Sequence, residues 1–274
     1  MKKINRRSFL AAAGLTAAAL ALTACGGSAS STASSTASSA ASSTSAAAEL
    51  TTVEAGKLTM ATNATFPPYE MTTDSGEIEG IDVDTAKAIA EKLGLELQID
   101  DMDFDAALLS VQQGKADIVM AGVTVTDERK AVMDFSDSYA TGIQSIIVPE
   151  GSDIASPDDL AGKMIGTQRG TTGYIYCSDD FGDETVVAYD DGLTAVQALN
   201  NGQVDAVVID NAPAKEFVAA NPGLVILDTS YAEEDYAIGM AKGSSLEDAV
   251  NAVLEELKAD GTLQSIVDKY ITAE

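Results

Sequence analysis

A repeated passage restricts the fold of this chain more than any other feature, because it predicts two similar halves. Residues 106–122 and 194–210 share one order: a helical pattern, a glycine, a short turn, an aspartate and a buried apolar strand. The two Gly-x-x-Asp units begin at Gly114 and Gly202. Helices that alternate with strands indicate parallel sheets with crossover helices. We therefore expect two α/β lobes; the alternative is a chance similarity between two amphipathic helix–strand units.

Other elements of the first half follow the same alternation. Apolar residues recur at every second position in the expected strands and at every third or fourth position in the expected helices. Gly94 and Gly114 would end the two helices, as glycine commonly does. The expected elements are strands over residues 57–62, 95–99 and 116–120, a hairpin over 69–78, and helices over 83–93 and 105–113.

The first 24 residues predict an export signal. Four basic residues precede an apolar run from Phe9 to Leu22, which suits a signal peptide and is too short to cross a bilayer comfortably. The end of this run resembles the lipobox of bacterial lipoproteins, in which the cysteine, here Cys25, is diacylated on its thiol. A small-residue cleavage site that contains cysteine by chance is the alternative. Arg6 and Arg7 also resemble a twin-arginine signal, so the export route stays open.

Residues 25–55 are expected to form a lipidated cysteine and a flexible linker. Residues 26–48 are glycine, serine, alanine and threonine only, a composition that has no core-forming side chains and stays a flexible coil. Such a tether would hold the protein at the extracytoplasmic face of the cell membrane while it works in water. The rest of the chain is long enough for two modest cores, and no later segment reaches transmembrane length.

The composition excludes several classes of function. A net charge of −27 would repel nucleic acid. The chain has no histidine, and Cys177 has no disulfide partner once Cys25 is lipidated. Triads that need histidine and zinc sites of the Cys/His type are therefore excluded, and we expect neither a metal nor a cofactor.

Candidate binding residues cluster in the segment 121–136, which follows the expected strand 116–120 and leads into an amphipathic helix. Loops beyond the carboxyl ends of parallel strands bind ligands in open α/β sheets. The segment contains Gly122, the hydroxyl of Thr124 and the guanidinium of Arg129, which can clamp a carboxylate through two hydrogen bonds. A capping threonine and a surface arginine are the alternative. Asp210 follows the equivalent strand of the second half, so two facing lobes would bring these loops to one cleft.

These residues belong to a set of motifs that resembles a known family. From about residue 57 to 270 the chain is similar to the extracytoplasmic solute-binding proteins of polar amino-acid ABC importers, the glutamine-, histidine- and lysine/arginine/ornithine-binding group. Each motif is weak alone, and their order behind a lipobox is specific. The motifs are Ala61–Glu70, Gly80–Asp84, Met102–Phe104, Ala121–Arg129, Asp134–Ser136, Gly170–Thr172 and Asp205–Asp210.

The resemblance implies a fold and a mode of action. It implies a type II periplasmic-binding-protein-like α/β fold, with two lobes joined by a two-stranded hinge near Tyr139–Thr141 and Glu234–Tyr236. Lobe 1 would comprise residues 56–140 plus 236–274, and lobe 2 residues 141–235. The lobes of a monomer would close on one free amino acid, which an ABC permease would then receive.

The resemblance also implies how the ligand backbone is bound. Arg129 would grip the α-carboxylate, helped by backbone N–H groups near Thr124 and Thr172. The Gly122 carbonyl, the Thr124 hydroxyl and Asp210 would take the α-ammonium. A buried zwitterion needs partners of both signs, and this set supplies them. Asp210 is also well placed to cap a helix, and both roles can hold at once.

The side-chain end of the site is less constrained. Phe66 and Phe104 match an aromatic pair that sandwiches the ligand in relatives, with ordinary core packing as the alternative. Asn63 stands where many relatives carry Asp, and Gln168 stands where glutamine binders carry Lys. These amides suit glutamine, asparagine or another uncharged polar amino acid. The aromatic faces, with Glu70 and Asp103 nearby, would also suit arginine or lysine.

Two other functions share this fold. Secreted cyclohexadienyl or arogenate dehydratases use a carboxylic acid in the cleft as a general acid, which here would be Asp210 or Glu70. Nothing in the sequence pairs such an acid with a second chemical group, and we expect a binding protein and not an enzyme. A ligand-sensing partner of a separate receptor is the other alternative.

Overall fold

The computed structural model describes residues 50–271. The expected signal segment, Cys25 and most of the linker lie outside the described residues. All elements described below belong to the unit Ala48–Glu274. None of the helices within residues 50–271 is long and apolar enough to cross a membrane.

The first lobe is built on a five-stranded sheet of order β5-β1-β6-β14-β7. β1 lies parallel to β5 and β6, and β14 is antiparallel to β6 and β7. A small antiparallel sheet, β2-β3-β4, contains the predicted hairpin. The strands are β1 Lys57–Thr62, β2 Thr65–Phe66, β3 Glu70–Thr72, β4 Ile78–Glu79, β5 Glu96–Asp101, β6 Ile118–Val119, β7 Met133–Phe135 and β14 Gly239–Ala241.

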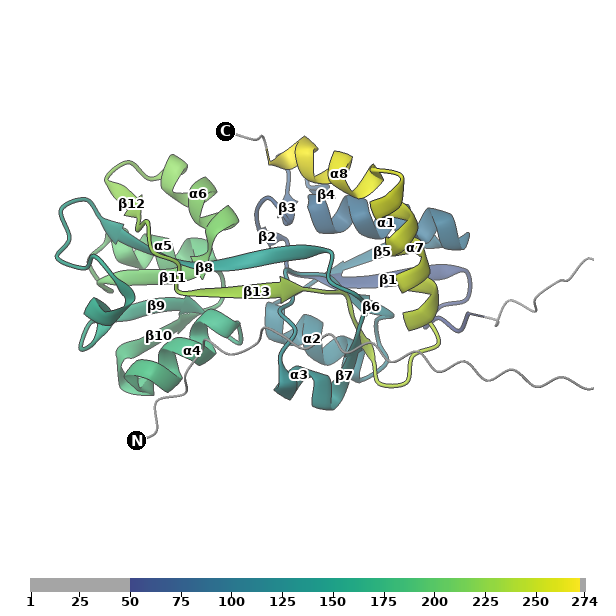
Figure 1. The fold of residues 1–274 in the computed structure, drawn as a ribbon, viewed down its shortest axis with the longest axis horizontal. Coiled ribbons are helices and arrows are strands. Elements are labelled where there is room, and N and C mark those ends of the chain that lie inside the picture. The colour runs from purple at the N-terminus through teal and green to yellow at the C-terminus, as the bar shows by residue number, and fades with distance from the viewer. Residues whose placement is uncertain (1–49, 272–274) are drawn as a thin grey trace, which may run out of the picture. The chain divides into compact units, whose positions relative to one another are not determined.

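Five helices belong to this lobe. α1, α7 and α8 pack against one another, so the C-terminal helices return to the first lobe (Figure 1). α1 ends at Gly94, as predicted, with that residue in the left-handed conformation. The helices are α1 Ile81–Leu93, α2 Phe104–Gln112, α3 Asp127–Val132, α7 Glu247–Ala259 and α8 Thr262–Tyr270.

The second lobe has a six-stranded sheet of order β10-β9-β11-β8-β12, with β13 paired to β8. β9 is parallel to β10 and β11, whereas β8 is antiparallel to its neighbours. The strands are β8 Ala140–Pro149, β9 Ile165–Gln168, β10 Val186–Tyr189, β11 Ala206–Asp210, β12 Leu224–Ile226 and β13 Ala232–Tyr236. The helices are α4 Thr172–Phe181, α5 Gly192–Asn200 and α6 Asn211–Ala220, with short 3-10 turns at Pro157–Leu160 and Asp183–Thr185.

Two antiparallel strands connect the lobes. β8 and β13 run side by side from one lobe to the other (Figure 1), and Ala140 pairs with Tyr236 at the end nearer the first lobe. Beyond this pair, the Tyr139 amide donates to the Tyr236 carbonyl, at 3.0 Å, before the chain enters the first sheet. The predicted fold class, two α/β lobes joined by a two-stranded hinge, is confirmed.

The repeated passage makes the same local structure in both lobes. Gly114 and Gly202 follow α2 and α5 with φ of 65° and 67°, a conformation that favours glycine. The Asp117 carboxylate then accepts the Thr59 amide at 2.7 Å, and that of Asp205 accepts the Met164 amide at 2.8 Å. Each aspartate therefore fastens its turn to the strand beside it, and this explains why the unit recurs.

Several predicted elements differ from the observed ones by one or two residues at their ends, among them the helix expected over 83–93, which begins at Ile81. The strand expected over 116–120 is regular only at Ile118–Val119, because Asp117 uses its side chain and amide to bind Thr59. The strand expected over 95–99 is β5, shifted toward Asp101, where it still pairs with the end of β1. α2 begins at Phe104, one residue before the expected start.

Candidate functional site

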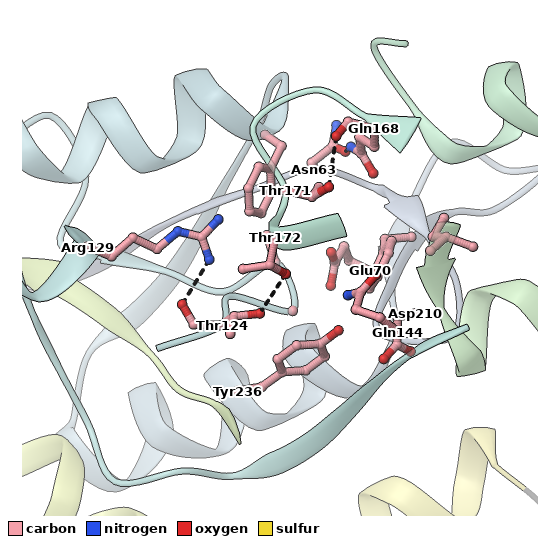
Figure 2. Close-up of a pocket in the computed structure, with 15 residues that line it drawn as sticks. Asn63, Glu70, Thr124, Arg129, Gln144, Gln168, Thr171, Thr172, Asp210 and Tyr236 are labelled. Carbon is pink, nitrogen blue, oxygen red and sulfur yellow. Dashed lines mark hydrogen bonds between the residues drawn. The ribbon is translucent and has the colours of Figure 1, made fainter. Parts of the chain in front are cut away.

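One cavity lies between the lobes and collects all nine residues singled out from the sequence (Figure 2). These nine are Asn63, Phe66, Phe104, Gly122, Thr124, Arg129, Gln168, Thr172 and Asp210. Six further residues line the cavity: Glu70, which the sequence analysis expected nearby, and Ala121, Gln144, Thr171, Ile209 and Tyr236, which it did not single out as binding residues. Asp103, expected near the site, is exposed immediately before α2 and does not line the cavity.

Arg129 supplies the positive charge of the cavity. Its position is set by α3, whose N-cap Thr126 accepts a hydrogen bond from the Arg129 amide. The side chain is only 8% exposed, and it donates to the carbonyls of Thr124, at 2.8 Å, and Gly170, at 3.1 Å. Its guanidinium carbon lies 5.4 Å from the centroid of the Phe104 ring.

The charge of Arg129 is not neutralised by a direct ion pair. None of the ion pairs found within residues 50–271 involves this side chain. Burial lowers the pKa of Arg129, and the negative charge of Glu234 acts in the opposite direction. A buried guanidinium that contacts two neutral carbonyls is well suited to bind an anionic group of a ligand.

Arg129 also contributes to a close contact between the lobes. Gly170, which accepts its second hydrogen bond, belongs to the second lobe and has φ of 72°. A side chain at this position would overlap the carboxylate of Asp105 on α2. The loop before α4 can therefore approach the first lobe only because the residue there is glycine.

Asp210 supplies an acidic group from the second lobe. It ends β11 and caps α6, accepting the Ala212 amide at 2.9 Å and the Ile143 amide at 2.8 Å. Burial raises the pKa of Asp210 to about 6, although these amides and the nearby Tyr236 hydroxyl lower it. The predicted capping role is confirmed, and it does not exclude binding because each carboxylate oxygen can accept a further hydrogen bond.

A second buried acid lines the cavity. Glu70, on β3, is fully buried, and neither of its carboxyl oxygens has a hydrogen bond of good geometry within residues 50–271, although the Asp82 carboxyl lies beside it. Burial raises the pKa of Glu70 well above its usual range, and the neighbouring carboxyls of Asp82 and Asp101 raise it further. Burial therefore favours the protonated form of this carboxyl, and its oxygens can accept hydrogen bonds from a donor-rich group.

Asp82 lies beside Glu70 and binds both the loop at Gly122 and Tyr139 next to the hinge. Its carboxylate accepts the Gly122 amide at 3.0 Å and the Tyr139 hydroxyl at 2.8 Å. Burial raises its pKa to about 6, while these two donors lower it. Asp82 thus holds Gly122, which lines the cavity, in place.

The two amides at the far end of the cavity are bonded to each other across the lobes. Gln168, at the end of β9, donates to the Asn63 side-chain oxygen at 2.8 Å (Figure 2). Asn63 in turn donates to the Met102 carbonyl at 3.0 Å. Each amide therefore already has a partner in the absence of a ligand.

Both aromatic residues combine lining and packing. Phe66 stacks on Tyr69 with ring centroids 5.8 Å apart, as part of the larger core cluster. Phe104 belongs to a smaller cluster under α2. Core packing of the two rings is therefore observed, while a sandwich around a ligand stays a prediction. Residues 50–271 contain no group of three acidic or cysteine side chains that could hold a metal ion.

Comparison with protein families gives a match over most of the described chain. The model of the bacterial extracellular solute-binding proteins, family 3, matches residues 58–273. Among curated proteins, the probable histidine-binding protein of Neisseria gonorrhoeae is 32% identical over 280 residues, covering 99% of this chain and 98% of its own. The arginine-binding extracellular protein ArtP of Bacillus subtilis is 33% identical over 268 residues, covering 93% and 94%.

Solved structures give the same result. An ancestral arginine-binding protein bound to glutamine has a TM-score of 0.76 and 42% identity, covering 80% of this chain and 99% of its own. The arginine-, lysine-, histidine-binding protein ArtJ of Geobacillus stearothermophilus has a TM-score of 0.76 and 34% identity, covering 80% and 96%.

Proposed function

This chain belongs to the bacterial extracellular solute-binding proteins, family 3, and from that premise we propose that it captures one polar or basic L-amino acid by closure of its lobes and delivers it to an ABC importer. The family and the relatives named above are binding proteins, and no catalytic role is proposed. Turnover of prephenate or arogenate by the purified protein would contradict this choice.

The observation that carries the proposal is the pair of opposite charges in one buried cavity. Arg129 enters from the first lobe and Asp210 from the second. An α-amino acid carries one carboxylate and one ammonium on the same carbon, so it can satisfy both residues together. Because the partners lie on different lobes, only the closed form completes the contacts, and the ligand stabilises closure.

We assign the α-carboxylate and the α-ammonium of the ligand to two sets of cavity residues. Arg129 and backbone N–H groups near Thr124 and Thr172 bind the carboxylate. Asp210, the Gly122 carbonyl and the Thr124 hydroxyl bind the ammonium. Burial raises the pKa of Asp210 to about 6. The positive charge of a ligand ammonium beside it would lower that pKa and favour the ionised carboxylate.

Glu70 favours a cationic side chain for the ligand. A guanidinium or an ammonium would supply the hydrogen bonds that both carboxyl oxygens of Glu70 lack, and Phe66 and Phe104 would offer aromatic faces to it. Several relatives are named for arginine, histidine or glutamine. We therefore propose arginine or lysine first, and glutamine, which suits Asn63 and Gln168, second.

The N-terminal signals complete the proposal. Cys25 would carry the lipid, and the linker after it would hold the monomeric binding domain at the outer face of the cell membrane, near the permease. Metabolic labelling with a radioactive fatty acid checks this assignment. Label should enter the full-length chain and should be lost in Cys25→Ser, with the protein then released into the medium.

A calorimetric titration with each of the twenty amino acids tests the function. We expect one-to-one binding of arginine, lysine or glutamine and no binding of the aliphatic amino acids. Binding confined to apolar amino acids would contradict the proposal. A sensor in place of a transport component would show the same binding, but uptake would persist after deletion of the cognate permease.

Replacing Glu70 by glutamine distinguishes a cationic ligand from an uncharged one. Arginine affinity should fall by about tenfold or more, because the variant cannot become negative, while glutamine affinity should change by less than about threefold. In the wild type, arginine binding should also release a proton, since the cation favours ionised Glu70. Titrations in buffers of different ionisation enthalpy measure that release.

Glu77→Gln is the matched control for this prediction. It removes the same charge from the exposed turn of the same hairpin. If arginine and glutamine lost affinity equally in the Glu70 variant, Glu70 would not distinguish between ligand side chains.

A further inference from the structure

A third acid lies close to the site without lining it. Glu234 is on the hinge strand β13, whose backbone pairs with Gly142 on β8. Its neighbours Glu233 and Asp235 are exposed, whereas Glu234 is only 6% exposed. Within residues 50–271 it forms no ion pair with a lysine or arginine. A buried acid of this kind needs hydrogen-bond donors.

Three cavity-lining side chains donate to one oxygen of Glu234. The hydroxyls of Thr124 and Thr172 reach its Oε2 at 3.1 Å and 2.9 Å, and the Gln144 amide reaches it at 2.9 Å. Thr124 belongs to the first lobe, and Thr172 begins α4 in the second. The other oxygen, Oε1, has no partner among the described residues. Glu234 therefore depends on these donors, and they connect both lobes to the hinge.

These hydrogen bonds determine whether the hydroxyls of Thr124 and Thr172 can donate to a ligand group or only accept from it. A hydroxyl has one proton, and both protons are used within this cluster. Each hydroxyl donates to Glu234, or one donates to the other across 3.4 Å (Figure 2) while the second donates to Glu234, so the two oxygens offer the cavity only lone pairs. Lone pairs accept hydrogen bonds from an ammonium and cannot donate to a carboxylate. If a hydroxyl rotated toward a ligand carboxylate, Glu234 would lose a donor in a buried position, which is unfavourable.

We propose that Glu234 is a positioning residue that acts through Thr124 and Thr172 and makes this part of the cavity selective for a primary ammonium group. Asp210, at the same cavity, adds a negative charge, and Arg129 is left free for the ligand carboxylate. The inference rests on the proposed function, because it assigns the α-amino group of the ligand to these hydroxyls. It adds a selectivity-determining residue that does not touch the ligand.

The test compares an amino acid with the same molecule without its α-amino group. Affinities of L-arginine and 5-guanidinopentanoate are measured by displacement of labelled arginine, for the wild type, Glu234→Gln and Glu233→Gln. If glutamine is the preferred ligand, L-glutamine and glutaramate replace them. Wild-type binding of the amino acid tests the proposed function by itself, separately from the role of Glu234.

The expected result is a loss of selectivity in one variant only. The ratio of the two affinities should fall by about tenfold or more in Glu234→Gln and stay unchanged in Glu233→Gln, an exposed residue on the same strand with the same charge change. An unchanged ratio in Glu234→Gln would overturn the inference, as would an equal weakening of both ligands.

A double-mutant cycle separates positioning from a general effect on the hinge. If Glu234 acts through the hydroxyl of Thr124, Glu234→Gln should cost little further affinity for the amino acid once Thr124→Val is present. Fully additive losses would overturn the inference. Thermal unfolding of each variant identifies any loss of folded protein, and affinities are then referred to the folded fraction.

Discussion

Replacing Arg129 with alanine should weaken binding of the preferred amino acid by about a hundredfold, the largest effect expected of any single substitution here. The guanidinium is buried, and within residues 50–271 its hydrogen bonds go to the neutral carbonyls of Thr124 and Gly170, so a ligand carboxylate would be its charged partner. Removing one member of such a desolvated pair leaves the other charge buried without compensation. Isothermal titration calorimetry with the amino acid measures the loss.

Lys130→Ala is the matched control, because it removes one positive charge from the next, exposed, residue of α3. Its affinity should stay within about twofold of the wild type, since exposed charges contribute little. Arg129→Lys should recover only part of the affinity, because an ammonium lacks the planar fork that holds a carboxylate through two bonds. Near-normal binding by Arg129→Ala would defeat the assignment of Arg129 to the carboxylate.

Lowering the pH from about 7.5 to about 5 should make the unliganded protein more stable, by several kcal/mol. The groups responsible are Asp82, Asp210 and Glu70, whose pKa values burial raises, to about 6 for the two aspartates and well above the usual range for Glu70. A raised pKa means that the folded state holds more protons than the unfolded state between the two values. The stabilisation is therefore complete below about 4 and is lost as the pH rises through about 6 and, for Glu70, beyond.

The size of this effect follows from the shifts. Because the pKa of each aspartate is about 6 in the folded state, each one contributes on the order of 1–2 kcal/mol between about pH 7.5 and 5, and Glu70 adds to this. Half-buried Asp134 and exposed Asp153 have lowered pKa values, because Lys242 and Lys163 bind them. The stability that they contribute is lost only below about pH 4, outside the pH range of this experiment. Urea unfolding at each pH, without ligand, measures the free energy of unfolding.

Asp82→Asn tests the origin of the pH dependence. Because this variant cannot ionise, its stability should depend less steeply on pH than that of the wild type between about 5 and 7.5. Asp74→Asn, on the exposed hairpin turn, should keep the wild-type slope. A wild type that loses stability as the pH falls across this window would contradict the assignment of these buried carboxyls.

Several features of the site followed from local sequence. The glycines after α2 and α5, the capping threonine of α3 and the capping Asp210 are properties of a few neighbouring residues, which sequence patterns report well. The repeat predicted that the loops after β6 and β11 would be equivalent, and in the structure Gly122 and Asp210 line one cavity. The binding roles of these residues stay predictions until ligand affinities are measured.

Asp103, expected in the neighbourhood of the site, directly precedes the cavity-lining Phe104 but does not itself line the cavity. α2 begins one residue earlier than its pattern indicated: Phe104 is its first residue and is buried, whereas Asp103, at the N-cap, is exposed. Boundaries of that accuracy are set by packing of the helix against its sheet.

The sequence by itself determined the alternation of strands and helices, the duplicated α/β unit and the presence of one arginine and one aspartate beside equivalent strands. Only the tertiary structure decided that Glu70 lies in the cavity, that Gln144 and Tyr236 reach it from the hinge strands, and that Glu234 holds two of its hydroxyls. The physical reason is that a strand presents alternate side chains to opposite faces, and which face meets the cavity depends on how two lobes, distant in sequence, pack around the hinge.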